Sequence, residues 1–208
     1  MNKAFIPVAL ALLSMTASAQ TPRFTGSIGA GYTEPVFDMG PGHDRGFNIK
    51  GSAGMNFHHS AGLNLNFLYN DLQINSNTLS ALRVPGGSTR LWSLTLDPVI
   101  HFRRSAESRA DFYITGGGGI HRVTSEITAP GQIAAFVPFQ GTVYPPNASA
   151  DQVIRSNSVY KAGLDAGAGV AFGSGRFHSK FFAEAKYYHI YMGNNPITIV
   201  PVTIGLKF

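Results

Sequence analysis

The 208-residue chain contains no cysteine, and only 13% of its residues are charged. Without cysteine, neither a disulfide framework nor a thiolate metal site can stabilise the fold. The charged fraction is about half that of ordinary soluble domains, so much of the surface is expected to face something other than water. After residue 19, no apolar run approaches the roughly 18 residues that indicate a spanning helix. If the mature chain enters a membrane, it must do so as β-strands, because only helices and closed barrels satisfy every backbone group in lipid.

The first residues predict export. Lys3 precedes an apolar run from Ala4 to Leu13, and Ala17, Ser18 and Ala19 supply the small residues that a signal peptidase accepts. The run is shorter than the ~20 apolar residues of a spanning helix. We therefore predict that residues 1–19 are a cleaved Sec signal peptide and that residues 20–208 form one domain.

The mature segment alternates between apolar and polar residues in eight stretches, and one of the clearest sets Leu94 and Leu96 against Ser93, Thr95 and Asp97. A strand sends successive side chains to opposite faces, so each stretch predicts a two-faced strand. Several polar faces carry ions in mid-strand, whereas the apolar faces are almost free of charge. Apolar residues that face lipid and polar residues that face a lumen are typical of a transmembrane β-barrel.

Short turns are predicted after the second, fourth and sixth stretches, and longer connections after the first, third and fifth. Outer-membrane barrels have short periplasmic turns and long extracellular loops. We therefore predict an all-β fold: an eight-stranded antiparallel up-and-down transmembrane β-barrel with both termini on the periplasmic side. Pro98 cannot donate a ladder hydrogen bond, so a bulge or local distortion is expected in its strand.

The mid-strand ions predict a charge network inside this barrel. Its members are Lys50, Asp97, Lys161, Asp165, Glu184 and Lys186. If the turn at residues 173–178 is symmetric, Asp165 lies directly opposite Lys186. Eight strands enclose an interior just wide enough for side chains to fill it, so we expect these ions to pair with one another. A narrow gated channel for ions or small solutes is the alternative, because intramembrane ions can also mark a pathway.

Aromatic residues gather toward the ends of the predicted strands, as the interface girdles of a membrane barrel require. The predicted girdle consists of Phe24, Tyr32, Phe57, Tyr69, Trp92, Phe102, Tyr160 and Phe172. A soluble lipocalin-like barrel is a third possibility, because its strands alternate as well, but its apolar faces would point inward.

The last strand carries the most specific pattern. Val202, Ile204, Leu206 and Phe208 alternate with small or polar residues, and the chain ends on the aromatic ring. With this ending, the chain resembles the small eight-stranded outer-membrane barrels, the family that includes the OmpA transmembrane domain and OmpX. The resemblance implies an outer-membrane location in a Gram-negative-type cell and contact with outer-membrane lipid and lipopolysaccharide. It also implies that these four residues form a signal that the barrel-assembly machinery reads.

The longest predicted loop, residues 123–157, is unusually apolar, with Phe136, Val137 and Phe139 among its residues. It is expected either to form an adhesive surface for an extracellular partner or to fold over the barrel mouth as a plug. We therefore expect a structural or surface-binding role carried by the extracellular loops.

Other chemistries find little support in the residues. Gly116 to Gly119 lacks the Lys and Ser/Thr of a phosphate loop. His58 and Ser60 could form a nucleophilic couple, but no acidic partner stands nearby in the sequence. The histidines show no ligand spacing, and the basic residues form no stripe with stacking aromatics. We expect no enzymatic activity, no cofactor, no metal site and no nucleic-acid partner.

Overall fold

A computed structural model describes residues 23–82, 86–102, 110–132, 135–137, 141–143, 149–173, 179–193 and 195–208. The long strands are β1 (Arg23–Pro35), β2 (Gly46–His58), β3 (Ala61–Gln73), β4 (Gly86–His101), β5 (Ala110–Gln132), β8 (Ser149–Phe172), β9 (Lys180–Ile190) and β10 (Ile197–Lys207). Shorter elements are η2 (Phe37–Gly42), α2 (Ser76–Leu82), β6 (Ala135–Val137) and β7 (Gly141–Val143). The predicted signal peptide, residues 1–19, lies outside the described residues. Within the described ranges, no helix has the length and apolarity needed to cross a membrane.

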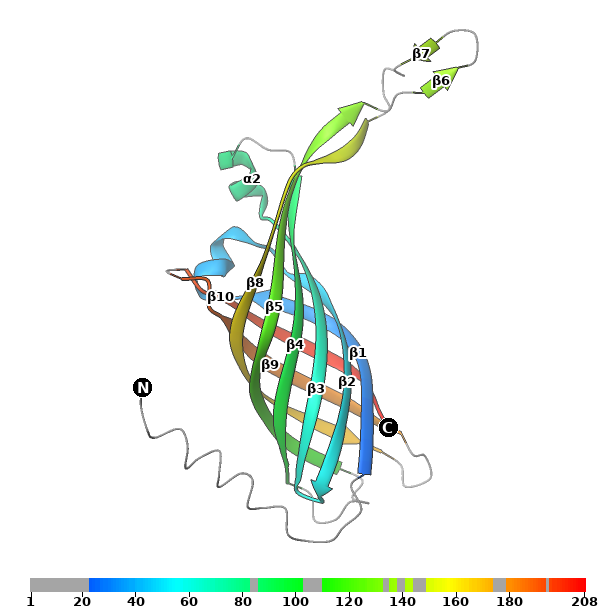
Figure 1. Ribbon diagram of the computed structural model, residues 1–208, viewed down its shortest axis with the longest axis vertical. Coiled ribbons are helices and arrows are strands. Elements are labelled where there is room, and N and C mark those ends of the chain that lie inside the picture. Colours follow the sequence, from blue (N-terminus) through cyan, green and yellow to red (C-terminus); the bar gives the residue numbers. More distant parts are fainter. Residues whose placement is uncertain are drawn as a thin grey trace.

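The eight long strands close into one antiparallel barrel in the order β1-β10-β9-β8-β5-β4-β3-β2. Closure is made by β1 and β10, in which Ala30 pairs with Ile204. Gly26 and Phe208 then exchange two backbone hydrogen bonds of 2.8 and 3.2 Å. The predicted all-β, eight-stranded up-and-down barrel is confirmed. The start of β1 and the end of β10 lie at one end, the terminal end, whereas η2 and α2 lie at the other, the loop end (Figure 1).

Each strand is two-faced, as the alternation predicts. In β4 every second residue from Trp92 to Ile100 is exposed on the outer wall, and the residues between them are buried. Leu94 is 42% exposed, whereas Asp165 in β8 and Lys186 in β9 are 6% and 3% exposed. Apolar side chains therefore cover the outside and ions fill the inside. This arrangement is the reverse of a lipocalin-like barrel, so that alternative is wrong.

Pro98 distorts its ladder without adding a residue to it. Between β4 and β5, Leu96 pairs with Gly118 and Val99 pairs with Thr115, so the register is the same on both sides of the proline. Only the pairs of Asp97 and Pro98 are missing from this ladder. The local distortion is present because proline lacks an N–H, but the bulge alternative is wrong.

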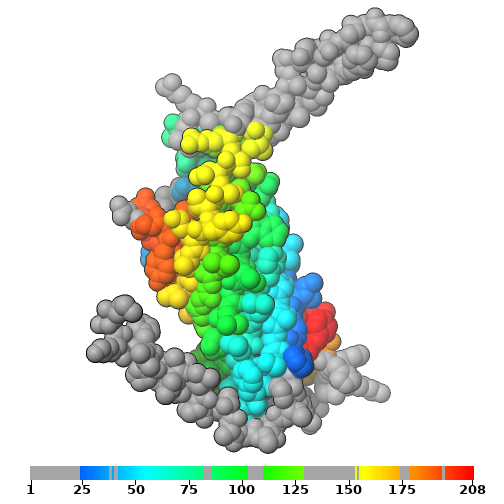
Figure 2. Space-filling view, in the orientation of Figure 1, coloured from blue at the N-terminus to red at the C-terminus, as the bar shows by residue number. Residues whose placement is uncertain are grey.

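β5 and β8 are much longer than their neighbours. They pair with each other as far as Gln132 and Ser149, whereas β9 stops pairing with β8 at Gly163. The two strands thus leave the barrel as a ribbon that leads away from its mouth (Figure 1). At the loop end, the yellow atoms of β8 stand higher than the orange atoms of β9 (Figure 2). The described part of residues 123–157 is therefore no plug, while Phe139 lies outside the described residues.

Candidate functional site

Ion pairs within the lumen connect strands that are distant from one another in the barrel as well as neighbouring ones. Lys50 of β2 pairs with Glu184 of β9, and the Tyr113 hydroxyl donates to Glu184 Oε2 at 3.0 Å. Lys186 of β9 pairs with Asp97 and, at 2.5 Å, with Asp165 Oδ1. These contacts connect β2, β4, β5, β8 and β9 across the barrel, so they fix the positions of the strands relative to one another.

The ion cluster consists of Lys50, Lys186, Asp97, Asp165 and Glu184, two ammonium groups against three carboxylates. Asn66 supports it from β3, because its Nδ2 donates to Asp97 Oδ2 at 2.6 Å. Asp165 Oδ2 is buried with no hydrogen-bond partner among the described residues. Burying ions is costly unless each is paired and hydrogen-bonded, so the cations hold the cluster together against an excess of negative charge.

Two expectations for this cluster differ from the structure. The β8–β9 register is shifted by two residues from the symmetric-turn prediction, so Asp165 lies opposite Tyr188 instead of Lys186. The two ions are diagonal neighbours, which a lysine side chain is long enough to connect. Lys161 faces the lumen half-buried, opposite His121, and forms no ion pair with the described residues.

Sequence reasoning did not include several residues that the structure brings to the lumen. Besides Tyr113 and Asn66, these are His101 and Asp111, whose Nδ1 and Oδ2 atoms lie 2.9 Å apart with both side chains buried. All four lie on the inward faces of their strands, which is the signal that could have identified them.

Apolar side chains close the lumen on both sides of the ion cluster. Toward the loop end they are Met39, Leu68, Leu72, Leu91, Val123, Tyr188, Ile190 and Ile199. Toward the terminal end they are Val99, Tyr113, Ala171 and Phe182. Leu68 and Phe182 break the alternation of the sequence because they belong to these interior clusters.

On the outer wall, a cross-strand row runs through four neighbouring strands near the loop end. Tyr69 pairs with Trp92, Trp92 with Arg122, and Arg122 with Tyr160. The rings of Tyr69 and Trp92 have centroids 4.6 Å apart. The guanidinium carbon of Arg122 lies 5.9 Å from the centre of the Tyr160 ring. We call these four residues the aromatic row.

The chemistry changes from one side of the aromatic row to the other. Toward the terminal end, the next row is apolar, with Phe67, Leu94 and Ile120 in register. Toward the loop end, the next row is ionic, because Arg90 pairs with Asp71 at 3.8 Å and with Glu126 at 3.2 Å. Such a change over two rows is what the boundary between lipid and water requires.

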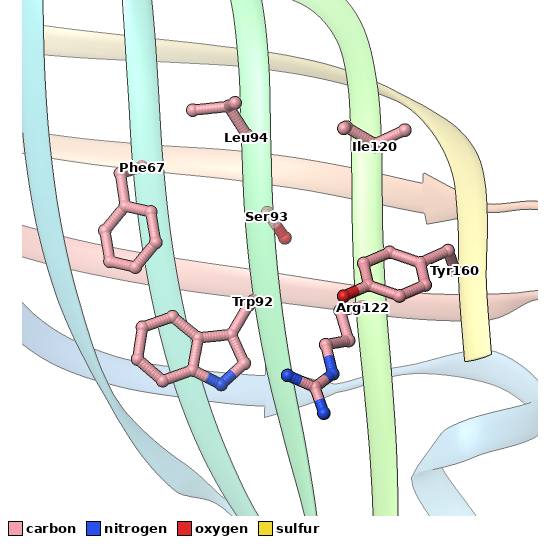
Figure 3. A pocket seen from close by; sticks show the side chains of 7 residues that line it. All are labelled: Phe67, Trp92, Ser93, Leu94, Ile120, Arg122 and Tyr160. Carbon is pink, nitrogen blue, oxygen red and sulfur yellow. The ribbon is translucent and has the colours of Figure 1, made fainter. Parts of the chain in front are cut away.

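A shallow hollow of about 260 Å³ lies on this wall, lined by Trp92, Arg122 and Tyr160 together with Phe67, Leu94 and Ile120. Figure 3 shows the guanidinium of Arg122 between the Trp92 and Tyr160 rings, with the three apolar side chains on the same wall.

The other predicted girdle and assembly residues also lie on the outer wall. Exposed rings near the terminal end are Phe24, Phe57, Phe102 and Phe172, and Tyr32 is exposed near the loop end. Val202, Ile204 and Leu206 share the outward face of β10, which pairs with β1, and Phe208 follows directly after the strand. Their predicted roles at the membrane interface and in assembly remain predictions.

The residues weighed for catalysis and metal binding have local roles here. His58 Nδ1 lies 2.8 Å from Ser60 Oγ and also accepts a hydrogen bond from the Ser60 N–H, so the couple braces the β2–β3 turn. Within the described ranges, no group of three or more His, Asp or Glu side chains could hold a metal ion.

Comparison with known proteins agrees with this geometry. Residues 5–208 match the model of the outer membrane protein beta-barrel domain. The chain belongs to this family. An outer membrane β-barrel of this kind is located in the outer membrane, as the sequence predicts. No curated protein matches the chain.

One solved structure, that of Neisserial surface protein A, shows the same fold as this β-barrel. Neisserial surface protein A (NspA) is 14% identical, with a TM-score of 0.59, and the match covers 90% of this chain and 98% of that one. Ail, the attachment invasion locus protein of Yersinia pestis, is 18% identical, with a TM-score of 0.49, over 89% of this chain and 99% of that one.

Proposed function

We propose that this outer membrane β-barrel is a surface-binding protein whose docking element is the β5/β8 ribbon. In this proposal the loop end lies outside the cell and both termini lie in the periplasm. The connections at the loop end, such as residues 36–45 and 74–85, are longer than the β2–β3 turn at residues 59–60. Long extracellular loops and short periplasmic turns are the rule for such barrels.

The observation that carries the proposal is the open edge of β8. The Tyr191 N–H donates to the Ala162 carbonyl at 3.0 Å. The backbone N–H and C=O of Ala162 therefore point toward the side on which β9 lies. Backbone groups alternate in direction along an antiparallel strand, so those of Tyr160, Ser158 and Ser156 point the same way. No described strand pairs with them there, because the β8–β9 ladder ends at Gly163.

An open strand edge is a template on which another chain can add a strand. Ser156 and Ser158 on this edge are exposed and small, so they leave the backbone accessible there. The partner chemistry that fits is an extended polypeptide segment at the cell surface. The barrel then acts as a rigid anchor, without catalysis and without a cofactor.

The channel alternative has less support from the lumen. The ion cluster is enclosed between the two apolar clusters, and its ammonium groups are bound to carboxylates. A conducting path would need these contacts to open together.

The test uses the full-length protein in proteoliposomes and a phage-displayed library of random twelve-residue peptides as the probe. Ser156→Pro removes one edge N–H, and Ser156→Ala is the matched control that keeps it. We expect selected peptides to bind the Pro variant about tenfold more weakly, because a hydrogen bond is lost and the ring obstructs the edge. Peptides that bind both variants equally would contradict strand addition.

Orientation is tested separately on intact cells. A protease recognition site inserted between β6 and β7 should be cleaved from outside if the ribbon is extracellular. Protection of this site in cells, with cleavage after lysis, would reverse the proposed orientation.

A further inference from the structure

The aromatic row contains one cation whose charge is not balanced within the wall. Arg122 donates to Ser158 Oγ at 3.4 Å and lies against the Tyr160 ring. Among the described residues, no carboxylate pairs with it. By contrast, Arg90 in the next row toward the loop end contacts both Asp71 and Glu126. Arg122 is therefore the guanidinium available to an external anion at the lipid boundary.

We propose that Arg122 and the hollow beside it bind a phosphorylated, acylated amphiphile of the outer leaflet, namely the lipid A part of lipopolysaccharide. A guanidinium can contact a phosphate through two parallel hydrogen bonds. Phe67, Leu94 and Ile120 continue the hollow toward the apolar band, where an acyl chain attached to that phosphate would run. The site thus provides one group for each half of an amphiphile.

The size of the hollow limits what it can hold. Pockets that enclose whole small ligands measure roughly 300–1,000 Å³. At about 260 Å³, and open on the outer wall, this hollow accommodates only part of an acyl chain. A lipid that stays in its leaflet and places one phosphate and one chain here fits better than a soluble ligand that must be enclosed.

Lipid A is the source we favour because of the position of the row. It lies near the loop end, which the proposed function assigns to the outside of the cell, so the inference uses that orientation. The row is within two residues of an ionic row on one side and an apolar row on the other, which matches the height of lipid phosphates.

Trp92 makes the site directly observable, because it is the only tryptophan in the chain and lines the hollow. The full-length protein is refolded in neutral detergent, where barrel orientation does not matter. Brominated phosphatidic acid, a phosphomonoester, is compared with phosphatidylcholine carrying the same brominated chains. We expect Trp92 quenching to require about fivefold less phosphatidic acid, the factor that follows from one cation beside anionic lipid.

Two variants locate the effect. In Arg122→Gln the ratio between the two lipids should fall to about one. Arg90→Gln removes the same charge from the next row but should keep the fivefold ratio, because its partners already neutralise it. An equal loss in both variants would mean a general effect of surface charge and would overturn the site.

If Arg122→Gln does not give the folded, heat-modifiable band, Arg122→Lys replaces it. The ratio between the two lipids should then fall by about half, because the two-pronged contact with the phosphate is lost. An unchanged ratio in this variant would contradict the proposal.

Competition identifies the source of the phosphate. Unlabelled lipid A should restore Trp92 fluorescence, and dephosphorylated lipid A should not. If phosphatidylglycerol restores it as well as lipid A does, the assignment to lipid A is wrong. If these assays fail, the proposal that the ribbon binds an extended polypeptide still stands. If the protease site is protected in cells, the proposed orientation is wrong, but Trp92 quenching in detergent does not change.

Discussion

Replacing Lys186 by methionine removes the cation that separates two buried carboxylates. Lys186 contacts both Asp97 and Asp165, and it is 3% exposed. Methionine fills a similar volume but leaves the two acids facing each other without a counter-ion. Removing one partner of a buried ion pair costs about 3–5 kcal/mol, so we expect the free energy of unfolding to fall by about that amount.

The excess of negative charge in the ion cluster makes the opposite change mild. In Asp165→Asn, Lys186 keeps Asp97 and Lys50 keeps Glu184, so two cations face two carboxylates. Asp165 Oδ2 has no hydrogen-bond partner among the described residues, so little is lost there. We expect this variant to lie within about 1 kcal/mol of wild type, because no charge is left unpaired.

Equilibrium unfolding in urea, followed by Trp92 fluorescence and by the heat-modifiable gel shift, measures both variants in lipid vesicles. Lys161→Met is the matched control, because Lys161 also faces the lumen but forms no ion pair with the described residues. It should change the free energy of unfolding by less than about 1 kcal/mol. If Lys186→Met and Lys161→Met are equally mild, the ion cluster contributes little to stability and the reasoning fails.

Three further outcomes are expected. Phe208→Ala should lower the amount of barrel in the outer membrane by about half or more, as measured by fractionation. Its free energy of unfolding in urea should stay within about 1 kcal/mol of wild type, because the Phe208 ring is exposed. The two measurements together distinguish an assembly defect from a loss of stability. Burial lowers the pKa of His43, whose Nε2 lies 2.9 Å from Thr89 Oγ1 and tethers the segment after η2 to β4. The His43 imidazole takes up a proton near pH 6.5 when the segment is unfolded, but only at lower pH when the segment is docked, so docking should weaken as pH falls below about 6.5. Hydrogen exchange of residues 37–42 should therefore become faster at low pH in wild type and not in His43→Gln. Purified protein in planar bilayers should give no discrete conductance steps, and regular steps that disappear in Asp165→Ala would restore the channel alternative.

The sequence was sufficient for the architecture because alternation is a property of each strand alone. Leu94 and Asp97 are assigned to opposite faces by parity, and the structure places them there. The β8–β9 register was wrong because it depends on the turn at residues 173–178, whose geometry parity does not specify. Leu68 and Phe182 do not follow the alternation, because the closed lumen also needs apolar residues and parity alone assigns apolar side chains to lipid.

The candidate sites were less predictable than the fold. The ion cluster was anticipated from residues of one face, but its partners depend on which strands face each other across the lumen. The aromatic row was missed as a unit, although three of its members were expected in a girdle. Arg122 joins them only through the registers of β3, β4, β5 and β8, and a single strand gives no sign of this.

β8 connects the interior of the barrel to both proposed surface sites. Its residue Asp165 is held by Lys186, Tyr160 belongs to the aromatic row, and Ser156 lies on the open edge. A slip of one residue in this strand would move Asp165 to the lipid face and Tyr160 to the inside. The ion cluster and the surface chemistry therefore depend on the same register of β8. Lys186→Met, which leaves Asp97 and Asp165 without their shared cation, should loosen the ribbon and the lipid site together, even though neither touches the lumen ions.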